Sequence, residues 1–248
     1  MSQQQKLLII IATYNECENI ISILDEVFKN APTAHILVID DLSPDKTYEL
    51  VQNHINSKYP TRLFLIKRSG KLGLGTAYIA GFNYALNNNY DIVMHMDADF
   101  SHNPKYIPQF LKEIKNADLV LGSRYVKGGS VVNWGLLRKI ISKCGSLYSR
   151  LILSIPHHDL TGGFKCFRIQ VLKTIDPNSI LSNGYAFQVE TTYRTFLNNF
   201  KIIEIPIIFE DRRVGQSKMS SKIFIEALFM IIKLRFLKNR FINKLKKS

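Results

Sequence analysis

The sequence predicts an α/β protein with a mostly parallel, doubly wound sheet and helices on both of its faces. Two observations carry this prediction. Apolar segments rich in β-branched residues alternate along the chain with segments whose apolar residues recur at helical spacing. The strand-like segments also lack the apolar–polar alternation of half-exposed strands, which is typical of parallel strands buried on both faces.

The alternation is clearest between residues 6 and 122. The expected strands comprise residues 6–12, 35–39, 62–67, 91–96 and 119–121, and the expected helices comprise residues 17–30, 46–57, 76–87 and 104–115. In the first helix, Ile20, Leu24 and Val27 fall on one face, and Pro32 stops the helix. Strands that are connected through helices in this way pair in parallel by right-handed crossovers.

Four of these strands end in polar clusters, which are residues 13–16, 40–41, 67–68 and 97–99. The carboxyl ends of parallel strands meet at one edge of a sheet, where doubly wound proteins bind their ligands. Asp97 and Asp99 directly follow a mostly apolar run, and such paired carboxylates can hold a divalent cation together with nucleotide phosphates. The alternative for these two residues is turn and helix-capping chemistry.

Composition and missing motifs set further limits. The 248 residues are 46% hydrophobic and carry a net charge of +13, so we expect a globular protein with an anionic partner. The absence of a Gly-x-Gly-x-x-Gly turn after the first strand and of a Walker A sequence argues against a dehydrogenase and a P-loop NTPase. Residues 73–76 can hold a phosphate at a helix N-terminus or form a tight loop. We expect no signal peptide and no membrane-spanning segment.

The second half contains two helical segments that are both apolar and basic. Residues 136–153 are expected to form an amphipathic helix with a basic side, and Ser220 can cap a final helix. Residues 235–247 are dense in lysine and arginine. These features predict a peripheral protein on the anionic cytoplasmic face of a membrane. Two alternatives remain open: a helix with an ordinary solvated polar face, and a final helix packed on a membrane-spanning partner.

Seven motifs follow one another along the chain. They are Thr13-Tyr14-Asn15-Glu16, residues 40–45 (Asp-Asp-Leu-Ser-Pro-Asp), residues 71–78 (Lys-Leu-Gly-Leu-Gly-Thr-Ala-Tyr), Asp97-Ala98-Asp99, residues 122–125 (Gly-Ser-Arg-Tyr), residues 159–165 (Asp-Leu-Thr-Gly-Gly-Phe-Lys) and residues 211–218 (Asp-Arg-Arg-Val-Gly-Gln-Ser-Lys). Together they resemble glycosyltransferase family 2, and within it the dolichyl- and polyprenyl-phosphate mannosyltransferases. The resemblance covers the chain from Lys6 to Lys222.

This resemblance implies a GT-A fold and an inverting transfer of mannose from GDP-mannose to a polyprenyl phosphate. The nucleotide-sugar contacts that it implies are Ala12, Thr13, Tyr14, Glu16, Val38, Asp40, Asp97, Ala98, Asp99, Arg124, Arg212 and Lys218. Acceptor-phosphate contacts are implied at Arg124, Arg138 and Ser142, and a Mg²⁺ or Mn²⁺ site at Asp97, Asp99 and Ser101. Asp99, Arg124, Arg212 and Lys218 are the implied catalytic residues. The chain departs from many relatives at Ala12, where they have proline.

The acceptor decides whether a general base is needed. A phosphate monoester is already anionic near neutral pH and can attack directly, so the enzyme has to supply positioning and charge compensation. If the acceptor were an alcohol, Asp159 would be the candidate base. Gln188 and Glu190 are candidates for binding sugar hydroxyls, with ordinary surface positions as the alternative. Residues 211–218 are expected to form a basic loop that closes over the diphosphate.

We divide the chain into a catalytic domain (residues 1–218) and a basic membrane-associating tail (residues 219–248). Within the domain, residues 6–122 form the expected nucleotide-binding half and residues 123–218 the expected acceptor- and sugar-binding half. In the second half we expect a loop at residues 123–135, strands at 163–167 and 202–209, and a helix at 185–198.

Three other functions were weighed. The first is a family 2 enzyme that uses UDP-glucose or another sugar nucleotide. The second is an inactive, membrane-recruited subunit, which the complete Asp97/Asp99 and Arg212/Lys218 sets argue against. The third is a nucleic-acid-binding protein. We expect no nucleic-acid partner, because the chain lacks a recognition motif and its positive charge is concentrated on apolar helices.

Overall fold

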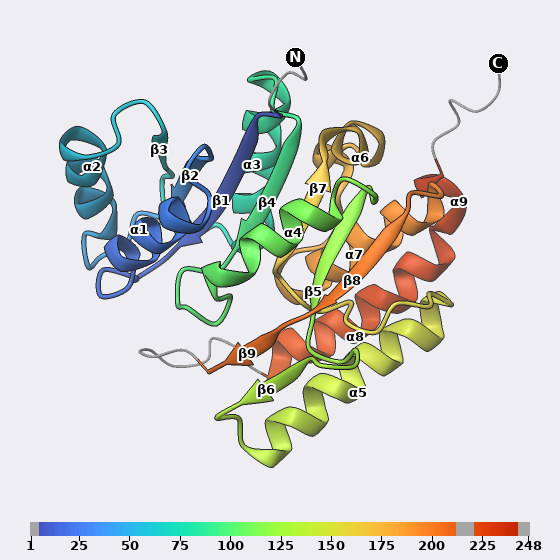
Figure 1. The fold of residues 1–248 in the computed structure, drawn as a ribbon. Coiled ribbons are helices and arrows are strands. Elements are labelled where there is room, and N and C mark those ends of the chain that lie inside the picture. Colours follow the sequence, from blue (N-terminus) through green and yellow to red (C-terminus); the bar gives the residue numbers. More distant parts are fainter. Residues whose placement is uncertain (1–4, 212–220, 243–248) are drawn as a thin grey trace.

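The computed structural model describes residues 5–211 and 221–242. They fold around a seven-stranded sheet with the strand order β3-β2-β1-β4-β7-β5-β8 (Figure 1). Its strands are β1 (Leu7–Thr13), β2 (His35–Asp40), β3 (Leu63–Lys67), β4 (Ile92–Met96), β5 (Leu119–Ser123), β7 (Lys165–Arg168) and β8 (Ile202–Pro206). All neighbouring strands are parallel except β7, which is antiparallel to both β4 and β5. The predicted mostly parallel α/β sheet is therefore confirmed.

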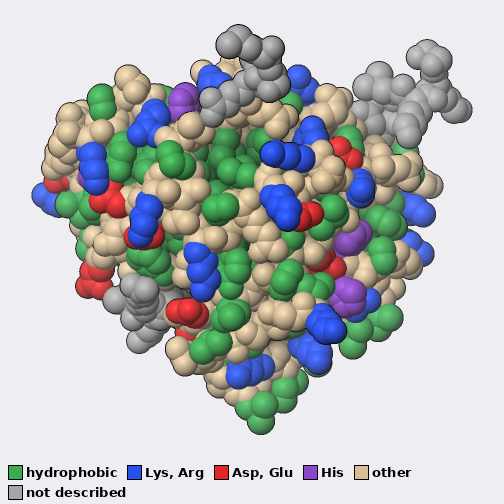
Figure 2. Space-filling view, in the orientation of Figure 1, with side chains coloured by type: hydrophobic (Ala, Val, Ile, Leu, Met, Phe, Trp, Pro, Cys, Tyr) green, Lys and Arg blue, Asp and Glu red, His purple; other side chains and the backbone are tan. Residues whose placement is uncertain are grey.

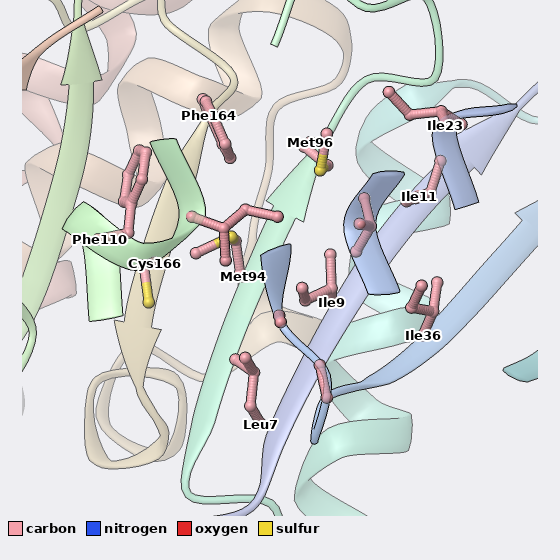
Figure 3. Close-up of a cluster of buried hydrophobic side chains, with 14 of the residues drawn as sticks. Leu7, Ile9, Ile11, Ile23, Ile36, Met94, Met96, Phe110, Phe164 and Cys166 are labelled. Carbon is pink, nitrogen blue, oxygen red and sulfur yellow. The ribbon is translucent and has the colours of Figure 1, made fainter. Parts of the chain in front are cut away.

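Helices cover both faces of this sheet. One face packs against α1 (Ile20–Asn30), α2 (Thr47–Ser57) and α4 (Ile107–Glu113), the last preceded by the short helix η1 (Pro104–Tyr106). The other face packs against α3 (Leu74–Asn87), α6 (Ile169–Ile175) and α7 (Gly184–Leu197), with η2 (Pro177–Ser179) between the last two. Successive residues of β1 enter the two cores in turn: Ile9 faces the first core (Figure 3), and Ile10 the second. This explains why the strand sequence shows no polar alternation.

A third layer lies beside the sheet. It contains α5 (Leu136–Leu153), α8 (Ser221–Phe236) and α9 (Lys238–Phe241), and α8 packs against α5 and α7 (Figure 1). Ile231 and Leu234 on α8 are buried, whereas Phe229 and Phe236 are 68% and 83% exposed. No helix within the described ranges is both long and apolar enough to cross a bilayer.

Several predicted boundaries differ from the structure. The first helix begins at Ile20 instead of residue 17, because the main-chain nitrogen of Cys17 donates to the carboxylate of Asp45 in the loop between β2 and α2. The strand expected at 202–209 breaks after Pro206, where Ile207 donates to the carbonyl of Ser123. Its second part is β9 (Ile208–Glu210), which pairs with β6 (Ser130–Val132) inside the expected loop 123–135. Helix α6 was not predicted.

Candidate active site

A large cavity opens at the carboxyl ends of β1 and β4. This sheet-edge cavity has a volume of about 630 Å³, within the range of small-molecule sites. The first turns of α3 and α7 and part of α8 contribute further walls. Seven of the residues predicted to bind a nucleotide sugar line it: Ala12, Thr13, Tyr14, Glu16, Asp97, Ala98 and Asp99.

A second, smaller cavity lies between α5 and α8. This helix cavity has a volume of about 150 Å³, and its lining includes apolar side chains such as Ile141, Leu228 and Ile231. Its polar lining includes all three predicted acceptor-phosphate residues, Arg124, Arg138 and Ser142, and also the predicted metal ligand Ser101. The cavity therefore combines apolar side chains with two guanidinium groups and the carboxylates of Asp97, Asp99 and Asp211.

The two cavities meet at the carboxylate pair. Asp97 and Asp99 line both of them, as do Thr161 and Gly163. A ligand in the sheet-edge cavity and a ligand in the helix cavity would therefore approach each other at these carboxylates. Such a junction is the geometry that a transfer reaction between two bound substrates requires.

Main-chain and hydroxyl groups hold the carboxylate pair in place. The main-chain nitrogen of Asp97 donates to Nδ1 of His102 (2.9 Å), and the hydroxyl of Tyr78 donates to Oδ1 of Asp97 (3.3 Å). Ser101 donates to Oδ1 of Asp99 from both its hydroxyl (2.6 Å) and its main-chain nitrogen (3.1 Å). Burial, reinforced by the charge of Asp97, raises the pKa of Tyr78 well above its usual value, so this hydroxyl remains a donor.

The pair has the donor chemistry of a divalent cation site. Carboxylate oxygens suit Mg²⁺ and Mn²⁺, which bind through one or two carboxylates together with phosphate oxygens and water. Within residues 5–211 and 221–242 there is no group of three or more His, Cys, Asp or Glu side chains arranged to hold a metal ion. Asp97 and Asp99 thus fit a cation whose remaining ligands come from a bound diphosphate. The Ser101 hydroxyl is directed to Asp99, which makes Ser101 a support of that carboxylate.

Two predicted nucleotide contacts lie behind the sheet-edge cavity instead of lining it. Val38 and Asp40 on β2 are fully buried. Asp40 accepts hydrogen bonds from the hydroxyls of Thr13 (2.8 Å) and Ser43 (2.6 Å), so it braces the end of β1, where the lining residue Thr13 lies. Its neighbour Asp41 does line the cavity and forms an ion pair with Arg68. The Asp-Asp motif correctly predicted an aspartate at this edge of the sheet, but only the fold shows that Asp41, and not Asp40, faces the cavity.

The glycine-rich segment before α3 forms a tight loop against α7. Gly73 has a positive φ of 99°, and a Cβ atom there would clash with the amide of Asn183. The main-chain nitrogen of Gly75 donates to Oδ1 of Asn183 (2.9 Å). Because this amide of the first helical turn already has a partner, the tight-loop interpretation of residues 73–76 is favoured. Lys71 from the same loop stacks over the ring of Tyr14 at 4.4 Å inside the sheet-edge cavity.

Arg124 is fixed by a buried ion pair. Its Nε and Nη2 donate to the two carboxylate oxygens of Asp159, each at 2.7 Å, and Nη2 also donates to the hydroxyl of Thr161. Burial alone would raise the pKa of Asp159, but the charge and hydrogen bonds of Arg124 outweigh it and hold this pKa below its usual value. Asp159 is fully buried, ionised and occupied by Arg124, so the structure argues against its role as a general base.

The remaining candidate residues are Arg138, Ser142, Gln188 and Glu190, and the first three line a cavity. Arg138 forms an ion pair with Asp211 (2.7 Å) and stacks on Trp134, while the Ser142 hydroxyl accepts from Tyr125 (2.7 Å). Gln188 lines the sheet-edge cavity.

Glu190 lines neither cavity. It is fully buried, pairs with Arg194, and accepts from the main-chain nitrogens of Leu181 and Ser182, so its expected sugar contact is not supported. The predicted phosphate contacts Arg212 and Lys218, and the predicted cap Ser220, lie outside the described residues.

The sequence assigned no site role to several lining residues, including Asp41, Lys71, His102, Thr161 and Gly163, and it assigned Trp134 only the role of a bulky anchor in the loop 123–135. Most of them lie within or beside the seven motifs, so their position near the site was signalled even though their contacts were not. No sequence motif signalled the contact that His102 makes. Its role as acceptor for the main chain of Asp97 depends on the turn that follows β4.

The fold and the junction of the two cavities define a GT-A glycosyltransferase. The chain belongs to glycosyltransferase family 2, whose model, described as "Glycosyl transferase family 2", matches residues 8–176. Polyprenol monophosphomannose synthase of Mycolicibacterium smegmatis is 42% identical over 92% of this chain and 86% of its own. Undecaprenyl-phosphate mannosyltransferase of Micrococcus luteus is 43% identical over 90% of this chain and 91% of its own.

Solved structures share the fold. Glucosyl-3-phosphoglycerate synthase from Mycobacterium tuberculosis, solved with Mn²⁺, UDP and glucosyl-3-phosphoglycerate, superposes with a TM-score of 0.65 at 16% identity. The match covers 96% of this chain and 81% of the other. At this identity the likeness concerns the architecture of the sheet and helices.

Proposed function

We propose that this enzyme transfers mannose from GDP-mannose to the phosphate of a polyprenyl phosphate, with inversion at the anomeric carbon. The observation that carries the proposal is the meeting, at Asp97 and Asp99, of a large sheet-edge cavity and a smaller helix cavity that contains two arginines. The first suits a nucleotide sugar, and the second suits a phosphate attached to a hydrocarbon chain. The names of the two mannosyltransferase relatives support the same pair of substrates.

The donor would lie in the sheet-edge cavity with its diphosphate at the carboxylate pair. A Mg²⁺ or Mn²⁺ ion bound there would neutralise the negative charge that develops on the diphosphate leaving group. Asp97 and Asp99 hold the ion, Thr13, Tyr14 and Glu16 bind the nucleotide, and Gln188 faces the sugar. The structural neighbour that was solved with Mn²⁺ and UDP supports a divalent cation in an enzyme of this fold.

The acceptor phosphate would lie in the helix cavity between Arg124, Arg138 and Ser142. One of its oxygens attacks the anomeric carbon, the bond from that carbon to the diphosphate breaks, and GDP leaves with the bonding electrons. Because the phosphate is already anionic, the residues named here have to position it and balance its charge. This agrees with the buried, ionised state of Asp159, which leaves no base at that position.

A donor and acceptor panel tests the proposal. GDP-mannose, UDP-glucose and UDP-N-acetylglucosamine are each incubated with a short polyprenyl phosphate or the matching free polyprenol, with Mg²⁺ or Mn²⁺. We expect transfer from GDP-mannose to the phosphate only. Transfer from UDP-glucose would identify the alternative donor, and transfer to the free alcohol but not to the phosphate would overturn the acceptor assignment.

Arg138→Ala is expected to raise the KM for polyprenyl phosphate by about 10- to 100-fold, with a smaller change in the KM for the donor. A charge-assisted hydrogen bond to phosphate contributes roughly 1.5–3 kcal/mol, which corresponds to this range. Lys139→Ala is the matched control, because this neighbouring cation lines neither cavity. Equal effects of the two substitutions would show that Arg138 acts only through general surface charge.

The outer faces of α5 and α8 suit the surface of an anionic membrane. Leu136, Leu137 and Leu151 on α5 are 75%, 72% and 70% exposed. Basic side chains accompany the exposed apolar ones: Arg138, Lys139, Lys143 and Arg150 on α5 and Lys233 and Arg235 on α8. Figure 2 shows hydrophobic side chains at the lower tip of the molecule, where α5 lies, with Lys and Arg nearby. We propose that this face binds the cytoplasmic surface of the membrane that contains the acceptor.

The Leu137→Asp/Leu151→Asp double variant is expected to reduce binding to anionic liposomes at least tenfold, because each buried leucine contributes roughly 1.5–3 kcal/mol. Co-sedimentation with protein-free vesicles measures the effect. Leu50→Asp is the control, since Leu50 is 37% exposed on the distant helix α2 (Figure 1). Wild-type protein that fails to sediment with these vesicles would instead favour recruitment by a membrane-spanning partner.

A further inference from the structure

Lys165 is a buried amine that the proposed reaction does not use. It lies on β7 in the centre of the sheet, between β4 and β5, and its side chain is fully buried. Its Nζ donates to the main-chain oxygen of Gln188 (2.5 Å) and to the hydroxyls of Thr192 (2.9 Å) and Thr191 (3.3 Å). Among the described residues no carboxylate forms a salt bridge with it, and the oxygens of nearby Asp159 are taken by Arg124.

Such a placement is costly for a lysine. Burial lowers the pKa of Lys165 to about 7, and the charge of Asp159 offsets only part of this effect. An apolar side chain of similar length would avoid the desolvation penalty of an ammonium group in the core. What Lys165 contributes in this position is the set of three hydrogen bonds from its Nζ.

The three hydrogen bonds fasten α7 to the sheet. The hydroxyls of Thr191 and Thr192 also donate to the oxygen of Gln188, but those bonds stay within the helix. Lys165 instead ties this helical turn to β7. The same part of α7 carries Gln188, which lines the sheet-edge cavity, and Ala186, which lines both cavities. Fixing this turn fixes a wall of the site.

The pairing of β4 with β7 places Gly163 between Asp97 and the turn of α7 that carries Gln188. His95 on β4 is paired with Lys165 on β7, so that Asp97 and Gly163 come opposite each other two residues further on. A Cβ atom on Gly163 would lie 3.4 Å from Nε2 of Gln188 and 3.9 Å from Oδ1 of Asp97. The Gln188 side chain is 3% exposed, and its Oε1 has no hydrogen-bond partner among the described residues.

We propose that Lys165 is a positioning residue of the transfer reaction: by holding the main-chain oxygen of Gln188 it sets the Gln188 side chain beside Gly163 and Asp97, against the sugar of the donor. This inference rests on the proposed function, because it assumes that the donor sugar lies in the sheet-edge cavity. Lys165 does not touch the substrate. It acts through Gln188, so its effect should depend on the Gln188 side chain.

A double-mutant cycle tests this dependence. Lys165→Met removes the ammonium but keeps the length of the side chain, and the Gln188 oxygen retains its two threonine donors. We expect Lys165→Met to lower kcat/KM for the donor by about 10- to 100-fold, as misplacement of a contact group does. The KM for the acceptor should change less than about twofold, and the thermal midpoint should be unchanged or raised. In a Gln188→Ala background, Lys165→Met should lower kcat/KM for the donor by less than about twofold.

Thr192→Val provides a milder variant should Lys165→Met fail to fold. It removes one acceptor of the ammonium and should reduce donor kcat/KM by about 3- to 10-fold, again only when Gln188 is present. Thr195→Val is the matched control. Thr195 is equally buried on α7, but its hydroxyl donates to the main-chain oxygen of Thr191 and forms no hydrogen bond with Lys165.

The outcomes separate this inference from the proposed function. Wild-type transfer is measured first with the donor panel, and a wild-type enzyme that transfers none of these sugars contradicts the proposed function. If the wild type is active, additive losses in the Lys165/Gln188 cycle would overturn the positioning role. Unchanged transfer by Lys165→Met would overturn it as well, as would losses of equal size in Thr192→Val and Thr195→Val.

Discussion

Asp99→Asn is expected to lower the rate of sugar transfer by about a thousandfold, because it removes one of the two charges that can hold a cation at the diphosphate. The fold should persist, since the amide oxygen can still accept both hydrogen bonds from Ser101. Initial rates with saturating donor, acceptor and metal ion measure the effect. Chelation of the metal with EDTA should abolish wild-type transfer, and addition of Mg²⁺ or Mn²⁺ should restore it.

Glu49→Gln serves as the control for the change of carboxylate to amide. Glu49 is exposed on α2 and lines neither cavity. Its substitution by glutamine should therefore leave the rate of sugar transfer unchanged. An Asp99→Asn enzyme that retained more than about a tenth of the wild-type rate would exclude Asp99 from the cation site. Wild-type transfer that persisted in EDTA would exclude the cation itself.

Asp159→Asn is expected to reduce the free energy of unfolding by about 3–5 kcal/mol at pH 7, because it leaves the buried guanidinium of Arg124 without its charge partner. Urea unfolding measures this change. The KM for polyprenyl phosphate should rise in the same variant, since Arg124 would no longer be held toward the helix cavity. Asp91→Asn is the control, because Asp91 is exposed and accepts a hydrogen bond from the main chain of Lys6. This substitution should lower the free energy of unfolding by less than about 1 kcal/mol.

The same ion pair predicts a dependence of stability on pH. The pKa of Asp159 is lower in the folded protein than its usual value of 3.8. Its carboxylate therefore contributes its full stabilisation above about pH 5, and this contribution is lost as the pH falls through the lower, folded-state pKa. The difference in unfolding free energy between wild type and Asp159→Asn should be constant from pH 5 to 7 and shrink below about pH 4. A difference that grew on acidification would contradict the ionised state of Asp159.

Local patterns predicted the fold well where each segment could be interpreted alone. The period of apolar residues identifies β1, β2, β3, β4 and β5 and most of the helices between them. The parallel order of those strands followed from their alternation with helices. Boundaries were less accurate where a distant partner decides them. Helix α1 starts late because Asp45, 28 residues beyond Cys17, takes up the main chain of Cys17.

The site was predicted as a set of residues, but with incomplete roles. Asp97 and Asp99 were expected at the sheet edge and line both cavities there. Asp40 was also expected to contact ligand, and Glu190 was a candidate for a sugar contact or a surface position, yet both are fully buried and bonded to protein groups. A carboxylate that binds a ligand and one that braces a loop have the same sequence signature, and only the direction of the side chain separates them.

The sequence by itself determined the α/β class, the strand ends that carry carboxylates and the family to which the enzyme belongs. These depend on periodicity and on motifs of a few adjacent residues. The tertiary structure alone decided that Arg124 is locked to Asp159, 35 residues away, and that Lys165 reaches across the sheet to α7. It also decided that α5 and α8, far apart in the chain, enclose one cavity that opens onto Asp97 and Asp99. Contacts between distant segments depend on how the layers pack, and no local pattern encodes that packing.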